Sequence, residues 1–313
     1  MSAPGLPRFD LQSHSTRSDG ALEPAEVVAA AAGAGVQLLA LTDHDTLAGV
    51  VEAIVAGEEH GVSVVPAIEI SSIDHPMRGA DSGDDSGRVR ELHVLGYAID
   101  HTDPELLLTL ERFLADREQR TLRMAENLRS AGFELNTTTI DARVTAGEPI
   151  GRPHLAEAVL AHPGNAERLR AEEIDDVGSL IRAYLIEGKS AFALRETPTV
   201  AEAIEAIHAA GGVAIWAHPF WDVEGPDEVL AMIDRFRTLG IDGVEAFYVT
   251  HTREQTELLA ARCSELGLLS TGSADFHGPE NRLFSRFLAF ETYNLRPELG
   301  PIYPAAPSSS ASR

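Results

Sequence analysis

The sequence predicts an α/β barrel, and two observations support this fold class. Seven short aliphatic segments are typical of buried strands, and helical patterns separate many of them. Strands that alternate with helices favour a parallel sheet, and closing such a series produces a barrel. Most of the polar clusters rich in histidine and carboxylate come where a predicted strand ends, which is where the chemistry of such barrels takes place.

Each predicted element has a local justification. The helix at 22–34 has Pro24 in its first turn and ends near Gly33 and Gly35, a favoured start and stop. The other barrel helices are expected at about 46–60, 198–210, 226–239 and 253–266. The strands, which are short and rich in β-branched or aliphatic residues, are expected at 9–12, 37–42, 62–70, 92–99, 212–217, 241–247 and 268–273.

Residues 103–195 interrupt the alternation of strands and helices. Asp103 and Pro104 start a long helical pattern that runs to about Ala131, and shorter helices are expected near 137–146, 154–161 and 173–187. The sequence therefore predicts a barrel built from 8–102 and 196–303, with 103–195 as a helical insertion that forms a lid over its mouth. The polar, glycine-rich stretch at 74–90 predicts a mobile loop, and 304–313 predicts a disordered tail.

Composition narrows the class of protein. The chain has 313 residues, of which 44% are hydrophobic, so it can bury a sizeable core. It shows neither a secretory leader nor a membrane-length apolar stretch, so we expect a cytoplasmic protein that does not bind membranes. Its lone Cys263 excludes a disulfide framework and is expected to be a buried structural thiol.

The balance of charge also restricts the partners. With 49 acidic against 25 basic residues the net charge is −24, which disfavours long nucleic acids. Small phosphorylated molecules stay possible, because bound divalent cations can invert the charge of one pocket.

Six polar clusters carry the candidate chemistry. Imidazole and carboxylate together are the ligand set of zinc, manganese and iron. One such residue alone is a weak signal, since a lone histidine such as His93 on a strand is more often a core residue. Six clusters on successive strand ends, however, indicate a metal centre. Their ligand-type residues are His14, Asp19, Asp43, His44, Asp45, Glu69, Glu91, His93, His218, Asp275 and His277.

The same stretches resemble, in order, the motifs of the PHP (polymerase and histidinol phosphatase) superfamily. The similarity is greatest to its stand-alone phosphoesterases, which include 3′,5′-nucleoside bisphosphate phosphatases and 5′→3′ exoribonucleases. It covers nearly the whole chain, including the insertion. The matching stretches are 9–20, 41–46, 66–71, 91–97, 151–154, 217–219 and 272–278.

This resemblance implies a distorted seven-stranded (β/α) barrel with two or three divalent metals, for which Mn²⁺, Fe²⁺ and Zn²⁺ are candidates. Glu69 is implied to bridge the first two metals. The implied ligands, grouped by metal, are His14, Glu69 and Asp275; Glu69, His93 and His218; and Asp19, His44 and His277.

One position departs from the family pattern. The first motif of the family is His-x-His, but this chain has Gln12 in place of the first histidine. A neutral amide oxygen is a poorer ligand than imidazole for these metals, so the first site should be weaker or lost. Three interpretations stay open: a variant that works with fewer metals, an impaired or engineered variant, and a site that recruits another ligand.

The implied metals suggest phosphoester hydrolysis, because two nearby cations supply hydroxide at neutral pH and neutralise phosphoryl charge. Arg152, His154 and Asp275 are the catalytic candidates, and the first two also the candidates for phosphate binding. Without the resemblance, a surface arginine and a helix-capping histidine would be the favoured interpretation of the first two. Glu245 and His251 are further substrate-binding candidates, Glu245 alternatively as an acceptor for a ligand histidine.

Three residues in or next to the clusters are expected to have supporting roles. Asp43 and Asp45 are predicted to orient histidines rather than bind metal. Trp216 and Trp221 flank His218, and core packing is the favoured role for Trp221, with stacking on a base as the alternative.

The leading hypothesis is a metal-dependent phosphomonoesterase that removes the 3′-phosphate from nucleoside 3′,5′-bisphosphates. One alternative keeps the site but cleaves short RNA from its 5′ end, and the acidic composition favours the mononucleotide over this. Another is a catalytically impaired metal- or nucleotide-binding protein, because Gln12 replaces a ligand histidine. The sequence does not predict an oligomeric state.

Overall fold

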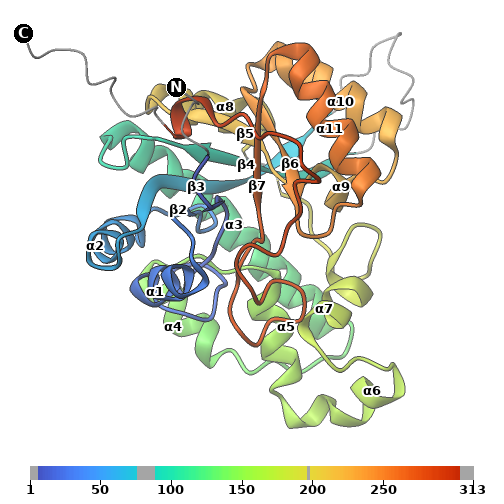
Figure 1. Ribbon diagram of the computed structural model, residues 1–313. Coiled ribbons are helices and arrows are strands. Elements are labelled where there is room, and N and C mark those ends of the chain that lie inside the picture. The colour runs from blue at the N-terminus through green and yellow to red at the C-terminus, as the bar shows by residue number, and fades with distance from the viewer. Residues whose placement is uncertain (1–5, 76–88, 196–197, 304–313) are drawn as a thin grey trace, which may run out of the picture.

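The computed structural model describes residues 6–75, 89–195 and 198–303. Seven strands form one curved sheet in chain order: β1 (Phe9–Asp10), β2 (Leu38–Leu41), β3 (Ser63–Asp74), β4 (Arg90–Tyr97), β5 (Val213–Trp216), β6 (Gly243–Tyr248) and β7 (Leu269–Ser273). The two edges of the sheet meet where the backbone N–H of Leu11 donates to the carbonyl of Gly272 at 3.2 Å. The result is a nearly closed barrel surrounded by helices (Figure 1), which confirms the predicted fold class.

One strand runs opposite to the others. β4 is antiparallel to both β3 and β5, whereas the remaining neighbours are parallel. The expectation of parallel strands is therefore wrong for β4. The ladder of β3 and β4 ends with Asp74 opposite Arg90, so the predicted mobile loop begins and ends in strand, and its residues 76–88 lie outside the described ranges. A parallel connection needs a crossover, usually a helix, and the glycine-rich sequence at 74–90 has no helical pattern.

Five longer helices pack around the barrel. They are α1 (Pro24–Ala34), α2 (Val50–His60), α8 (Val200–Ala209), α10 (Pro226–Leu239) and α11 (Arg253–Leu266). In α1, Pro24 occupies the first turn and the Glu26 side chain accepts from the backbone N–H of Glu23 at 3.0 Å. Gly35 ends the helix at a φ of 83°, a conformation that suits glycine. The predicted helix start and stop are confirmed here, while α2 begins four residues later than expected.

Alternation along each strand divides the apolar core into an inner and an outer layer. On β2, Leu38 and Ala40 pack inside the barrel, whereas Leu39 and Leu41 pack in the cluster under α1 and α2. Successive side chains of a strand point to opposite faces, so the inner face of every strand can be followed to the mouth of the barrel.

This alternation explains why the reversed strand still contributes to the mouth. On β4, Leu95 and Tyr97 belong to the inner cluster, so Glu91 and His93 share their face. Because β4 is antiparallel, its amino-terminal end lies beside the carboxyl ends of the other strands. His93 therefore reaches the mouth although it lies near the start of its strand.

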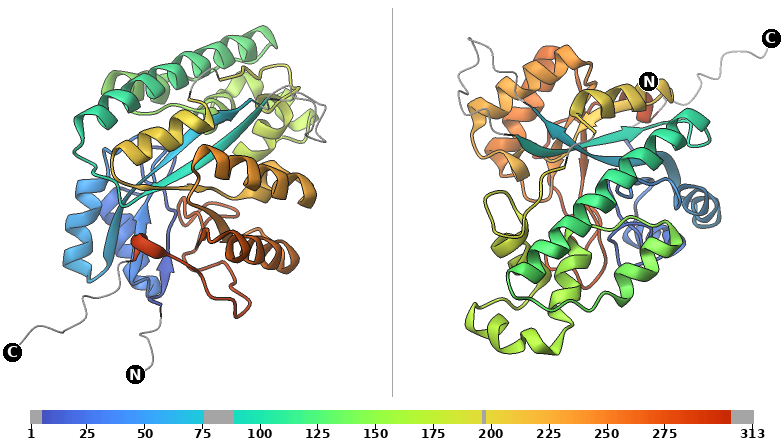
Figure 2. Two further views of the ribbon diagram at one scale, coloured as in Figure 1. Left: turned by 90° about the horizontal axis from the view of Figure 1, so that it is seen from above. Right: turned by 180° about the vertical axis from the view of Figure 1, so that it is seen from behind.

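Residues 104–185 form helices on one side of the barrel, and those after residue 137 lie below it in Figure 1. The helix α3 (Pro104–Ser130) is capped by Asp103, whose carboxylate accepts from the backbone N–H of Leu106 at 2.8 Å, and it crosses in front of the sheet in the right view of Figure 2, which is seen from behind. The segment at 173–187 is less helical than expected, with one short α-helix and a π-helical turn at Ile181–Leu185. The elements after α3 are α4 (Thr138–Ala146), α5 (Arg152–Leu160), α6 (Ala166–Ala171) and α7 (Val177–Leu180).

These helices share a separate apolar cluster, built around Met124, Leu128 and Leu155. Cys263 on α11 is 1% exposed, and burial raises the pKa of its thiol to about 12, so the prediction of a buried thiol is confirmed. Among the described helices, none has the length and apolar character needed to cross a membrane. The predicted disordered tail at 304–313 lies outside the described residues.

Candidate metal centre

The turn after β1 brings His14 and Asp19 together. Gly20 closes the turn by donating its backbone N–H to the carbonyl of Ser15 at 2.9 Å. A Cβ atom on Gly20 would lie 2.2 Å from the carbonyl oxygen of His14, so only glycine fits this close approach. The turn places Oδ1 of Asp19 at 3.7 Å from Nδ1 of the fully buried His14.

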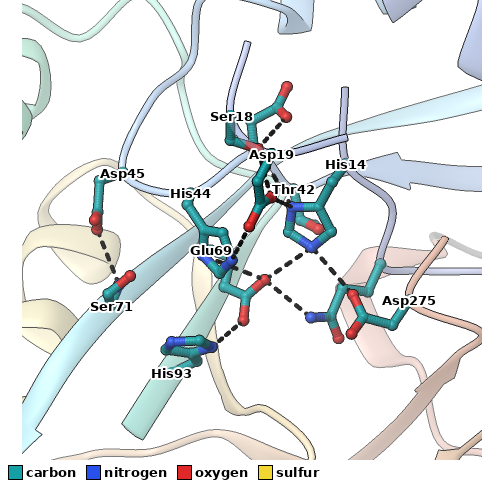
Figure 3. A network of polar contacts seen from close by, with 12 residues as sticks. His14, Ser18, Asp19, Thr42, His44, Asp45, Glu69, Ser71, His93 and Asp275 are labelled. Carbon is teal, nitrogen blue, oxygen red and sulfur yellow. Dashed lines mark hydrogen bonds and ion pairs between the residues drawn. The ribbon is translucent and has the colours of Figure 1, made fainter. Parts of the chain in front are cut away.

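Glu69, on the inner face of β3, lies at the centre of the cluster (Figure 3). Its Oε2 is 3.1 Å from Nε2 of His14 and 3.7 Å from Nδ1 of His44. Its Oε1 is 2.6 Å from Nδ1 of His93 and 3.3 Å from Nε2 of His218. Burial would raise the pKa of Glu69, but these four histidines outweigh burial and hold the pKa well below its usual range.

The loop after β7 supplies Asp275 and His277. Oδ1 of Asp275 lies 3.1 Å from Nε2 of His14, and Nε2 of His277 lies 3.6 Å from Oδ1 of Asp19. The hydroxyl of Tyr248, at the end of β6, donates to Oδ2 of Asp275 at 2.8 Å. Six of the seven strands, or the loops that follow them, thus supply ligand-type residues to one cluster, and β6 supplies Tyr248.

Backbone strain marks three of the loops that hold these residues. Asp45, His218 and Asp275 have φ values of 57°, 29° and 53°, in the left-handed region that non-glycine residues rarely adopt. Each such residue costs about 1–3 kcal/mol, and conformations of this kind gather at functional sites. The loops therefore hold their side chains in directions that relaxed backbone would not give.

The residues present fit a bound metal. Buried polar atoms normally have hydrogen-bond partners, but five ligand-type atoms of this cluster make no contact with hydrogen-bond geometry, although each lies within 3.7 Å of an imidazole nitrogen or carboxylate oxygen. These are Nε2 of His14, Nδ1 of His44, Nδ1 of His93, Nδ1 of His218 and Oδ1 of Asp275. A divalent cation binds such imidazole nitrogens and carboxylate oxygens together.

Three groups of described residues bring ligand atoms within 4.8 Å of one another: His14, Asp19, His44 and His277; His44, Glu69 and His93; and His14, Glu69 and Asp275. The last group is the set expected for a first metal. The first group is the set expected for a third metal with His14 added. In the second group His44 stands where His218 was expected, although His218 also contacts Glu69.

Gln12 is fully buried beside this cluster. Its Nε2 donates to Oε2 of Glu69 at 2.9 Å, and its Oε1 lies 3.4 Å from the hydroxyl of Ser273. An ionised carboxylate only accepts hydrogen bonds, so the NH₂ group of Gln12 must face Glu69. The side chain thus reaches the same carboxylate oxygen as His14, but as a neutral donor.

Glu245 and His251 lie near the cluster but are buried. Glu245 accepts from the backbone N–H of His218 at 2.9 Å and from the hydroxyl of Ser273 at 2.6 Å, and burial raises its pKa to about 8. Nδ1 of His251 is 3.2 Å from the carbonyl of Ala246, and burial lowers the pKa of His251 to about 4. In this structure both contact protein groups, and Glu245 fixes the backbone at His218.

Asp43 acts on a histidine through an intermediate residue. Its carboxylate accepts from the backbone N–H of Ser15 at 2.7 Å and from the hydroxyl of Ser18 at 2.6 Å. The hydroxyl of Ser18 also lies 3.5 Å from Nδ1 of His14. Asp43 therefore supports the turn that carries His14, without touching the imidazole.

Asp45 has a different partner from the one expected. Its Oδ2 accepts from Arg117 at 2.9 Å and from Arg195 at 3.2 Å, so the prediction that Asp45 orients a histidine is wrong. The two guanidinium groups outweigh burial and hold the pKa of Asp45 well below its usual range. Sequence reasoning missed both arginines, because neither lies in a motif and each is far from Asp45 along the chain.

Arg152 and His154 lie at the start of α5. Arg152 contacts Oε2 of Glu91 at 3.2 Å, and Glu91 shares the inner face of β4 with His93. His154 is buried, and its Nδ1 accepts from the backbone N–H of Gly151 at 3.1 Å, as a helix-capping histidine would. Burial lowers the pKa of His154 to about 4, so its imidazole is neutral at pH 7.

The two tryptophans behave differently. Trp216 is 1% exposed and packs against Phe236, as expected for a core residue. Trp221, on the short helix α9 (Pro219–Asp222), is 50% exposed, so core packing is the wrong role for it.

Comparison with known proteins identifies the family. The model of the PHP domain matches residues 10–209, so the chain belongs to the PHP domain family. A 5′-3′ exoribonuclease from Haemophilus influenzae is 34% identical over 87% of this chain and 90% of its own length. A 3′,5′-nucleoside bisphosphate phosphatase from Chromobacterium violaceum is 28% identical over 88% of each chain. A solved structure from that organism, an amidohydrolase with bound sulfate and no metal, has a TM-score of 0.72 at 28% identity, covering 88% of this chain and 90% of its own.

Proposed function

We propose that this chain removes the 3′-phosphate from nucleoside 3′,5′-bisphosphates. As a member of the PHP family with relatives named as phosphatase and exoribonuclease, it is a metal-dependent phosphoesterase. The substrate is the proposed part. The observation that carries the proposal is the convergence of histidines on the ionised carboxylate of Glu69, with Arg152 of the helical segment paired to Glu91 on the strand face that carries His93.

We assign the metals to the ligand-type atoms that gather around Glu69 and around Asp19. The proposed ligands are His14, Asp19, His44, Glu69, His93, His218, Asp275 and His277. When bound, divalent cations such as Mn²⁺, Fe²⁺ or Zn²⁺ lower the pKa of coordinated water and neutralise charge on phosphoryl oxygens.

The surrounding side chains hold this arrangement in place before substrate arrives. Tyr248 fixes Asp275 through its hydroxyl, Ser18 links Asp43 to His14, and Glu245 fixes the backbone of His218. Such outer partners are expected to set the direction of each ligand atom. Because they are already bonded, little reorganisation is needed when phosphate binds.

Arg152 is proposed to bind a substrate phosphate. Its side chain is 28% exposed, and its guanidinium lies next to Glu91 on the face that carries His93. A phosphate that enters beside His93 can take the place of Glu91 and accept two parallel hydrogen bonds from Arg152. His154, neutral at pH 7, caps the helix that carries Arg152, and we propose that 103–195 acts as a lid that positions both residues.

The net charge of −24 supports a mononucleotide over RNA, because a strongly acidic surface repels a polyanion. A 5′→3′ exoribonuclease is the second candidate, and the 34% identity to the Haemophilus influenzae enzyme favours it. Both activities use the same cluster and differ in how much of the substrate lies outside it.

The deciding experiment compares two substrates with added Mn²⁺. Phosphate release is measured from adenosine 3′,5′-bisphosphate, and mononucleotide release from a short 5′-phosphorylated oligoribonucleotide. We expect the bisphosphate to have the higher kcat/KM. A higher value for the oligonucleotide would replace the proposal by the exoribonuclease, and nucleotide binding without any release would indicate an impaired protein.

The same assay tests the role of Arg152. We expect Arg152→Gln to raise KM for the bisphosphate roughly tenfold or more, because a charge-assisted bond to phosphate is lost. The matched control is Arg170→Gln, which removes an exposed guanidinium of α6 whose hydrogen bond, among the described residues, stays within its own helix. Equal KM values for the two variants would remove Arg152 from the substrate site.

A further inference from the structure

A half-exposed tryptophan lies directly beside the candidate metal centre. Among the exposed large apolar side chains of the described residues, Trp221 is the aromatic one, at 50% exposure. Its backbone N–H donates to the carbonyl of His218 at 2.8 Å, so the backbone that carries the indole is held one turn beyond a proposed metal ligand. Trp216, five residues earlier in the chain, is fully buried. The exposure of Trp221 is therefore specific to its position.

The ring of Phe284 extends this aromatic surface to the other side of the site. The Trp221 and Phe284 ring centroids are 5.6 Å apart, and Phe284 lies 5.4 Å from the ring of His277. The carbonyl of Phe284 also accepts from the backbone N–H of His277 at 2.9 Å. The two rings thus connect the loop after β5 with the loop after β7, and the backbone of each of these two residues is hydrogen-bonded to a proposed ligand.

We propose that Trp221, supported by Phe284, stacks on the base of the nucleotide; this deepens the proposed function and depends on it. Every nucleobase has an apolar face, so stacking selects a nucleoside without reading the identity of its base. The polar groups proposed for the phosphates lie on the histidines of the metal centre and on Arg152, which is paired with Glu91, while the rings offer apolar surface beside His277. The pair would therefore distinguish nucleotides from sugar phosphates that lack a base.

The first test measures binding of a ligand that the enzyme does not consume. Adenosine 5′-monophosphate is the product of the proposed reaction, and its Kd for the Mn²⁺-loaded protein is measured by calorimetry. We expect Trp221→Ala to raise this Kd roughly tenfold, within the range that loss of one stacked ring produces. Trp221→Phe should keep most of the affinity, and the methyl riboside of ribose 5-phosphate, which lacks a base, should bind equally to all variants.

Leu283→Ala is the matched control, because Leu283 is 52% exposed and precedes Phe284 in the same loop. It removes apolar surface but no ring. An equal loss of affinity in Leu283→Ala would overturn the proposal, since it would attribute the effect to the loop rather than to stacking.

Fluorescence locates the contact. The chain has two tryptophans, and Trp216 is buried, so a change in emission on binding the monophosphate should come from Trp221. We expect the change to disappear in Trp221→Phe. Its persistence in that variant would place the base elsewhere and overturn the inference.

Measuring both phosphate release and monophosphate binding distinguishes failure of the stacking role from failure of the proposed function. Release of phosphate from the bisphosphate with the same KM in Trp221→Ala, together with unchanged binding of the monophosphate, would leave the phosphatase standing and overturn the stacking role. A Trp221-dependent affinity for the monophosphate without phosphate release would support stacking and overturn the phosphatase.

Discussion

Two buried glutamates in the same barrel differ in charge. Glu69 and Glu245 are both 0% exposed, each on the inner side of its strand. Histidines surround Glu69 and hold its pKa well below the usual range. Burial instead raises the pKa of Glu245 to about 8, because one histidine, His218, and the hydrogen bonds from Ser273 and the His218 backbone lower it by less than burial raises it. Two equally buried carboxylates can therefore differ in charge, because their neighbours differ. Of these two glutamates, Glu69 is the one prepared to bind a cation.

Gln12 lies between these two regions. Its amide donates to Glu69, and its carbonyl oxygen faces Ser273, whose hydroxyl bonds to Glu245. The neutral amide thus forms the boundary between an ionised region, suited to metal, and a neutral one that holds the loops. Changing each of the three side chains in turn tests whether this boundary is real.

The largest loss of activity is expected for Glu69→Gln. The substitution keeps the shape but removes the charge that four histidines surround. Loss of an outer partner of a metal ligand costs about 10- to 100-fold, so loss of the central ligand should cost roughly 100-fold or more in activity. Phosphate release and Mn²⁺ content of the purified protein are the measurements.

Glu245→Gln serves as the control for this experiment, since it is the same chemical change at equal burial. If both variants lost Mn²⁺ and activity to the same extent, the difference between the two glutamates would have no functional meaning.

Sequence alone anticipated the features that depend on neighbours along the chain. Strand and helix periods are local, and ligands such as His14 and Asp19 occur within one short turn. What it missed depends on pairing between distant segments. The direction of β4 follows from its ladders with β3 and β5, and Asp45 meets Arg117 and Arg195 across 72 and 150 positions. The exposure of Trp221 likewise depends on how the loops after β5 and β7 pack.

A smaller change, in metal affinity, is expected for Gln12→His. This variant tests directly whether Gln12 forms the boundary between the ionised and the neutral region. An imidazole at this position would face Oε2 of Glu69 and add one ligand to the ionised region. Mn²⁺ affinity should rise roughly tenfold, in line with the preference of these metals for imidazole over a neutral amide. Competition with a chelating dye gives both the affinity and the number of ions bound.

Gln12→Met is the control for that variant, because it fills a similar volume without a ligand for these metals or a donor for Glu69. Tighter binding in both variants would show that the amide merely hinders the site, and unchanged binding in Gln12→His would place position 12 outside the metal centre.

The smallest effect on activity is expected for Glu245→Gln. The pH dependence of the free energy of unfolding, however, should differ between this variant and the unaltered chain. In chelated protein the folded chain keeps the proton of Glu245 up to about pH 8, whereas the unfolded chain releases it near the ordinary value of 4.5. Between these values the folded state binds more protons, so this residue makes the free energy of unfolding fall as pH rises.

A glutamine has no such proton to lose, so the free energy of unfolding of the variant should fall less than that of the unaltered chain between about pH 5 and pH 8. The difference should be a few kcal/mol, because one pKa unit corresponds to about 1.4 kcal/mol. The fit is preserved, since Oε1 of a glutamine can accept from the backbone of His218 while its NH₂ donates to Ser273, whose hydroxyl then turns toward Gln12. Urea unfolding of both proteins at the two pH values measures the difference. Equal pH dependence would mean that Glu245 is ionised in the folded chain, in which case both glutamates belong to one charged site.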